Sequence, residues 1–173
     1  MEAGSGGEGG SAAGLAGSLD GQPPLDEAAV LREYPLDVLD PTQRAFAYRV
    51  LAWAGEVVAI YKEVEKTGTF RRVPLLRSFL GGSAGSGKFE TLQTIVQHVR
   101  LLFQRAHVAA TVELTAYTGV AAFNIGFGAK TACSAFKVFP KAAWKSELEG
   151  DAFRRLERIW SNVVLLIVDE VSF

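Results

Sequence analysis

Residues 79–88 read FLGGSAGSGK, which is the most informative segment of the sequence. Its last seven residues, Gly82 to Lys88, match the pattern G-x-x-x-x-G-K, which binds phosphate when it joins a strand to a helix. Glycines let the backbone approach phosphate oxygens closely with its amides pointing inward, and the following helix adds partial positive charge. We therefore predict a phosphate-binding loop. The alternative reading is a glycine-rich surface turn.

The candidate nucleotide-binding residues of this loop are Gly82, Ser83, Ala84, Gly85, Ser86, Gly87, Lys88 and Phe89. We expect Lys88 to reach the outer phosphates as a mobile positive charge and so to take part in catalysis. Phe89 departs from the motif, because a Ser or Thr hydroxyl normally binds magnesium there. Thr91 lies on the far side of the helix and is a poor substitute. We expect phosphate binding with weak magnesium coordination.

Short apolar runs alternate with amphipathic segments around the loop, as in a parallel sheet with crossover helices. The pattern predicts strands over Leu75–Leu80, Val108–Ala116 and Val163–Val168. It predicts helices over Lys88–Arg105, Gly119–Asn124 and Asp151–Ile159. The third strand is apolar at every position, which is typical of a strand covered on both faces. The expected fold class is α/β: an incomplete P-loop nucleoside triphosphatase sheet of the RecA-like type.

The N-terminal region divides into a tail and a helix. Residues 1–24 are rich in Gly, Ser and Ala, so we predict a disordered tail. A short helix is expected between Leu25 and Tyr34. A longer helix is predicted to begin at Asp40-Pro41-Thr42-Gln43, where Asp40 can cap and Gln43 can return to the cap, and to end at Thr67-Gly68. The motor domain is expected over residues 36–173.

Charge and cysteine content narrow the class of protein. Residues 1–40 carry eight acidic groups and one base, which leaves 11 acidic and 17 basic residues, a charge of +6, in residues 41–173. A basic body gives weak support to a polyanionic partner. Cys133 is the only cysteine, so the chain has no intramolecular disulfide partner. No apolar run approaches a membrane span, and no secretory signal is visible, so we expect an intracellular protein with no membrane contact.

An acidic pair follows the third predicted strand. Asp169 and Glu170 come at its carboxyl end, which is the edge of a parallel sheet where ligands bind. The segment resembles a Walker B motif. Asp169 could hold Mg²⁺, while Glu170 could orient and deprotonate an attacking water. The alternative is that two acids merely end a strand, and the preceding phosphate loop favours the functional reading.

Three segments together resemble PIF-type helicases of superfamily one, including those carried by Helitron transposons: residues 79–88, residues 113–126 (ELTAYTGVAAFNIG) and residues 165–173 (LLIVDEVSF). The resemblance covers about residues 36–173, and its middle segment is the most specific. It implies that Thr118 and Gly119 touch the backbone of single-stranded DNA and that Gln43 reads the adenine of ATP. The alternative for both Thr118 and Gln43 is that each only caps its own helix.

The chain departs from this family at Cys133 and at its C-terminal end. Cys133 stands where the family usually has a histidine, and we expect a small buried residue there rather than a nucleophile. Residues 136–145 interleave aromatic and basic side chains, which fits a single-strand-binding surface or buried aromatics beside solvated lysines. The chain also ends at Phe173, without the second lobe that closes over the nucleotide in such helicases.

The resemblance implies an ATP-dependent DNA helicase that uses ATP and Mg²⁺, here as a fragment that lacks the second motor lobe. We expect this chain alone neither to unwind duplex DNA nor to hydrolyse ATP at a useful rate. A catalytically inactive remnant that binds nucleotide or single-stranded DNA is the alternative. An unrelated P-loop ATPase is disfavoured by the segment at residues 113–126. The oligomeric state is open. Family likeness suggests a nuclear setting, with a mitochondrial one left open, and a role in DNA repair, recombination, telomere maintenance or transposition.

Overall fold

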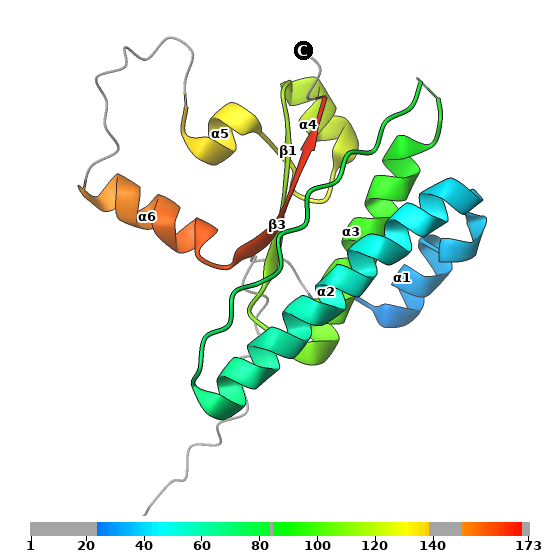
Figure 1. Ribbon diagram of the computed structural model, residues 1–173. Coiled ribbons are helices and arrows are strands. Elements are labelled where there is room, and N and C mark those ends of the chain that lie inside the picture. Colours follow the sequence, from blue (N-terminus) through cyan, green and yellow to red (C-terminus); the bar gives the residue numbers. More distant parts are fainter. Residues whose placement is uncertain (1–23, 84, 139–149, 171–173) are drawn as a thin grey trace, which may run out of the picture.

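The computed structural model describes residues 24–83, 85–138 and 150–170. Helices and parallel strands alternate along this part of the chain, so the predicted α/β class is confirmed (Figure 1). The tail predicted over residues 1–24 lies outside the described residues except for Pro24, which has no regular structure. No helix in the described ranges is long and apolar enough to cross a membrane.

The sheet has three parallel strands in the order β2-β1-β3. The central strand β1 (Thr111–Ala116) pairs along its length with β3 (Val163–Asp169), and β2 (Lys130–Thr131) adds a short edge. The register places Ala116 opposite Asp169. Because parallel strands end at the same edge, the residues that follow β1 and β3 meet there. That edge carries the candidate site.

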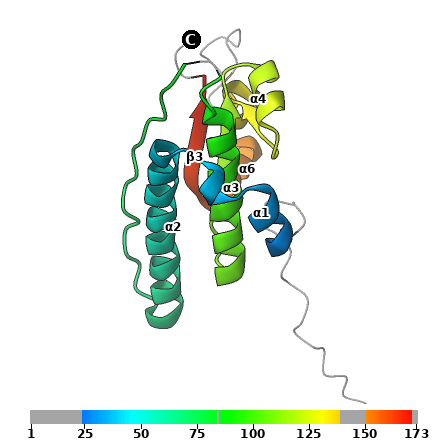
Figure 2. The same cartoon turned by 90° about the vertical axis from the view of Figure 1, so that its right-hand side faces the viewer.

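Two long helices, α2 (Pro41–Thr67) and α3 (Lys88–Ala106), lie side by side on one face of the sheet (Figures 1 and 2). Helix α2 begins as predicted: Asp40 accepts from the backbone amides of Thr42 and Gln43, and the Gln43 side chain accepts from the Asp40 amide. It ends at Gly68, whose φ of 67° suits glycine. The buried apolar residues of α2, α3 and β1 form one continuous core.

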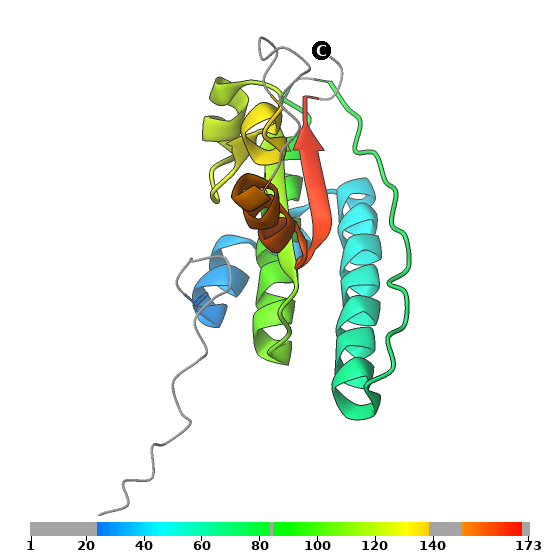
Figure 3. The ribbon, with the colours of Figure 1, turned by 90° about the vertical axis from the view of Figure 1, so that its left-hand side faces the viewer.

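Shorter helices flank this core. Helix α1 (Glu27–Glu33) and a 3-10 turn (Leu36–Val38) precede α2, and α1 contacts α3. Helix α4 (Gly119–Ile125) follows β1, while α5 (Ala132–Phe136) and α6 (Gly150–Trp160) lie on the side of the sheet away from α3 (Figure 3). The rings of Phe136 and Trp160 stack with centroids 4.8 Å apart, which joins α5 to α6.

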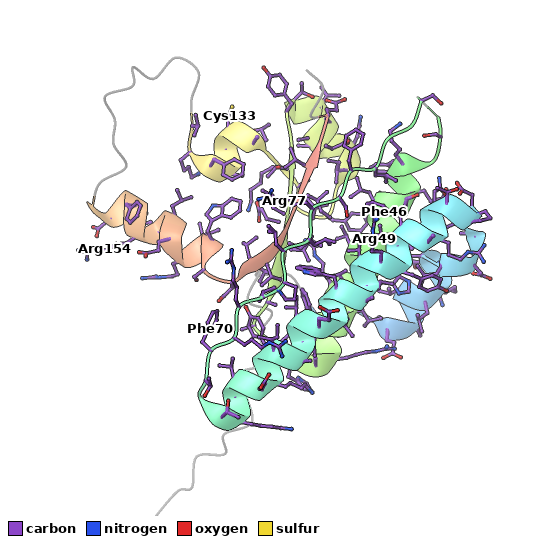
Figure 4. All side chains as sticks on the ribbon, viewed as in Figure 1. Phe46, Arg49, Phe70, Arg77, Cys133 and Arg154 are labelled. Carbon is purple, nitrogen blue, oxygen red and sulfur yellow. The ribbon has the colours of Figure 1, made fainter. Side chains whose placement is uncertain are left out.

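The strand predicted over Leu75–Leu80 is wrong: residues 68–83 have no regular structure. This segment carries Phe70 and Arg77 (Figure 4). Trp53 of α2 donates from its ring nitrogen to the Pro74 carbonyl at 2.7 Å. Proline has no amide hydrogen to give to a neighbouring strand. An apolar run becomes a strand only when a ladder partner pairs with it, and among the described residues this run has no such partner, while the residue before it is bonded to α2.

The expectation that β3 is covered on both faces is also wrong. Leu166 and Val168 of β3 are 40% and 41% exposed, so one of its faces is open among the described residues. The predicted strand over Val108–Ala116 begins later, at Thr111. Strand β2 and helix α5 were not predicted, because two strand residues and five helix residues are too short for a periodic pattern. The predicted helices are all confirmed, and their ends agree with the prediction to within two residues.

Candidate functional site

The phosphate loop lies between the irregular segment that ends at residue 83 and helix α3. It is at the end of the molecule where the strands finish (Figure 1). Gly85 and Gly87 have φ values of 76° and 72°, which side chains rarely adopt. A β-carbon at Gly87 would also lie 2.8 Å from the side-chain nitrogen of Gln43, so the backbone needs glycine there for both reasons. Ala84 was also predicted as a loop residue and lies outside the described residues.

Lys88 places its positive charge within the loop itself. Its ammonium donates to the carbonyl oxygens of Gly82 at 2.6 Å and Ser83 at 2.7 Å, and it lies 3.4 Å from the Ser86 hydroxyl. A β-carbon at Gly82 would collide with that hydroxyl. The loop backbone therefore curves around the Lys88 ammonium, and an anion that binds at the loop is attracted by this positive charge. Glycine-rich backbone with an ammonium at its centre suits a polyphosphate.

Gln43 connects the start of α2 to this loop. Its amide oxygen accepts from the Asp40 backbone, while its amide nitrogen donates to the Ser86 carbonyl at 2.8 Å. The capping role considered for Gln43 is confirmed, and the side chain also contacts the loop. A role in reading adenine stays a prediction.

Phe89 and Thr91 are the residues on which the expectation of weak magnesium coordination rests. Phe89 is 41% exposed and offers no oxygen ligand. Thr91 is fully buried, and its hydroxyl donates to the Gly87 carbonyl at 2.9 Å, which agrees with the prediction that it is a poor substitute for the missing ligand. Among the described residues there is no group of three or more His, Cys, Asp and Glu side chains that could hold a metal. The Asp169 carboxylate is the one predicted magnesium ligand.

Asp169 and Glu170 lie at the carboxyl end of β3, as predicted, and both are half-buried. The Asp169 carboxylate accepts a hydrogen bond from the backbone amide of Glu170 at 2.9 Å. Glu170 itself has a left-handed backbone conformation with a φ of 57°. The Thr118 hydroxyl donates to the Glu170 carboxylate at 3.4 Å and accepts from the Ala121 amide at 3.1 Å. Thr118 therefore caps α4, as the alternative reading proposed, and it also touches the acidic pair.

The contact between Thr118 and Glu170 was not predicted. These residues are 52 positions apart in the sequence, and no spacing rule joins them. The sheet register brings them together, because Ala116 and Asp169 are paired and each candidate follows within two residues. Gly119 is exposed at the first turn of α4, beside Thr118.

Two other predicted features, Cys133 and the segment at residues 136–145, take no part in these contacts as far as the structure describes them. Cys133 is half-buried on α5 (Figure 4), where a packing role fits. Most of the aromatic and basic segment at residues 136–145 lies outside the described residues. Its first residue, Phe136, packs on Trp160, so that aromatic ring is engaged within the fold.

Comparison with known proteins places most of these residues within one family match. The family model for PIF1-like helicases matches residues 56–173, which is more than half of the chain. The match includes the phosphate loop, Thr118, Gly119 and the acidic pair, and it leaves out Gln43. Searches of curated proteins and of solved structures found no match.

Proposed function

Because the chain belongs to the PIF1-like helicase family, we propose that its residues 36–173 form the first motor lobe of an ATP-dependent DNA helicase. One observation carries this proposal most directly. The ammonium of Lys88 lies inside a glycine-rich loop that Gln43 contacts from α2, and this loop lies at the same end of the molecule as the end of β3, where Asp169 and Glu170 stand (Figure 1). This is the combination that a nucleoside triphosphate needs: a phosphate cradle and a neighbouring carboxylate pair.

Each residue has a distinct task in this proposal. The loop amides and Lys88 bind and neutralise the outer phosphates, which carry the developing charge of phosphoryl transfer. Glu170 orients the attacking water and accepts its proton. Asp169 would hold Mg²⁺, which would neutralise further charge on the phosphates of ATP. With Phe89 in place of a hydroxyl, we expect the metal to be held mainly through the nucleotide.

We propose single-stranded DNA as the second ligand. Thr118 and Gly119 are exposed at the same sheet edge, where a hydroxyl and a backbone amide can bond to a phosphate of the strand. The net positive charge of residues 41–173 favours such a polyanion. Repair, recombination, telomere maintenance and transposition rest on family likeness alone.

Unwinding itself requires two lobes that close over ATP and step along one strand. Because we assign residues 36–173 to one lobe, we propose that this stretch by itself binds ATP and single-stranded DNA without unwinding duplex DNA. A nucleotide- or DNA-binding remnant is the second candidate, and the Phe89 side chain at the magnesium position favours it.

The two candidates differ in turnover. We expect the purified chain to bind a fluorescent oligothymidine in anisotropy titrations, more weakly as salt rises. ATP hydrolysis above background that increases with added oligothymidine would favour a working motor lobe. Binding without hydrolysis would favour the remnant. Strand separation by the chain alone would contradict the one-lobe account.

A further inference from the structure

The hydroxyl of Thr118 serves two partners at once. It accepts from the Ala121 amide, which caps α4, and it donates to Oε2 of Glu170. A hydroxyl has a single hydrogen to donate. Thr118 therefore cannot donate to a DNA phosphate while it donates to Glu170.

The other end of this contact is constrained as well. Glu170 has a left-handed backbone conformation and gives its amide hydrogen to Asp169, so its backbone is fixed at the end of β3. Its carboxylate is half-buried and reaches across to the start of α4. The hydrogen bond from the Thr118 hydroxyl fixes the direction of this carboxylate and occupies one of its acceptor sites. The contact thus restrains the residue to which we assign water activation.

We infer that Thr118 is a positioning residue that holds the Glu170 carboxylate until single-stranded DNA takes its hydroxyl. This inference rests on the proposed function and adds a link between its two ligands. When a strand phosphate accepts from Thr118, Glu170 is released to orient water. When no strand is bound, Glu170 stays restrained at α4, and hydrolysis without DNA is suppressed.

The competition has a consequence that does not require turnover. If Glu170 and a phosphate compete for one hydrogen, removing the Glu170 carboxylate strengthens DNA binding, but only while the Thr118 hydroxyl is present. A general effect of negative charge would instead appear with or without that hydroxyl. A double-mutant cycle separates these two explanations.

The test uses the full 173-residue chain, labelled oligothymidine and anisotropy, in buffer without magnesium or nucleotide. The variants are Thr118→Val, Glu170→Ala and the two combined. We expect Glu170→Ala to tighten DNA binding about five-fold more in the Thr118 background than in the Thr118→Val background, as loss of one competing hydrogen bond implies. Asp169→Asn removes a neighbouring charge that does not contact Thr118, and we expect it to cause less tightening than Glu170→Ala.

Thr118→Val also weakens the α4 cap, so Thr118→Ser provides a second background that keeps both the cap and the donor. We expect Glu170→Ala to tighten binding there as it does in the wild type. Equal tightening in the valine and threonine backgrounds, or in Asp169→Asn, would overturn the inference while the proposed function stands. No binding of oligothymidine by the wild-type chain would overturn both.

Discussion

The side-chain nitrogen of Gln43 donates to the Ser86 carbonyl at 2.8 Å while its oxygen accepts from the Asp40 amide, so one amide joins the start of α2 to the phosphate loop. The two bonds use opposite ends of the group. Substitutions that remove one end or both can therefore separate its contribution to helix stability from its contribution to the loop.

Gln43→Glu keeps an oxygen for the cap, but it loses the donor to Ser86 and adds negative charge beside the loop. We expect the affinity for a fluorescent ATP analogue to fall about ten-fold, with little change in melting temperature. Gln43→Ala loses both bonds, so we expect a lower melting temperature together with a smaller loss of affinity. Wild-type affinity in both variants would show that the contact with Ser86 does not shape the loop.

Phe89→Ser restores a hydroxyl at the predicted magnesium position. Because Phe89 is 41% exposed, the substitution removes less packing than it would at a fully buried position. We expect magnesium to increase the affinity for ATP about ten-fold more in this variant than in the wild type, measured by calorimetric titrations with and without the metal. Phe89→Ala removes the ring without adding an oxygen. If the serine and alanine variants respond to magnesium alike, the missing hydroxyl is not what limits metal binding.

Asp40→Ala removes the side chain that caps α2 through the amides of Thr42 and Gln43. Loss of such a cap costs about 1 kcal/mol, which corresponds to a fall of about 3 °C in melting temperature for a domain of this size. Glu56→Ala, at an exposed position in the middle of α2, is the control. Equal melting temperatures for the two variants would argue against a stabilising cap.

Glu27 and Arg105 form an ion pair between α1 and α3, with Nε of Arg105 2.8 Å from the carboxylate. The hydrogen bond from Arg105 lowers the pKa of Glu27. A lowered pKa means that the pair's stabilising effect is present above the ordinary pKa of glutamate and is lost as the pH falls through the lowered value. We expect Arg105→Gln to raise the pKa of Glu27 toward its ordinary value in an NMR titration of the carboxyl group. An unchanged pKa would mean that the pair does not persist in solution.

Local chemistry made much of the fold predictable. The capping box at Asp40 and Gln43, the left-handed glycine at Gly68 and the run of apolar residues in β3 each fix a boundary without help from distant parts of the chain. Lys88 begins α3 at the position that the loop motif requires. These features depend on neighbours within a few residues, which a sequence displays directly.

What the sequence could not predict depends on partners far along the chain. Leu75–Leu80 has the composition of a strand, but its conformation depends on whether a neighbouring strand bonds to it. The contact of Thr118 with Glu170 depends on sheet register, and that of Gln43 with Ser86 depends on how α2 meets the loop. The individual site residues were identifiable from the motifs, whereas their mutual contacts were not.

Titration of the chain with a fluorescent ATP analogue shows whether residues 82–88 form a working phosphate loop. We expect saturable binding by the wild-type chain and at least about ten-fold weaker binding by Lys88→Ala, because Lys88 supplies the charge within the loop. Lys66→Ala, in the last turn of α2, controls for loss of a lysine elsewhere and should bind as the wild type does. Equal binding by Lys88→Ala and the wild type, or no binding by either, would contradict the claim.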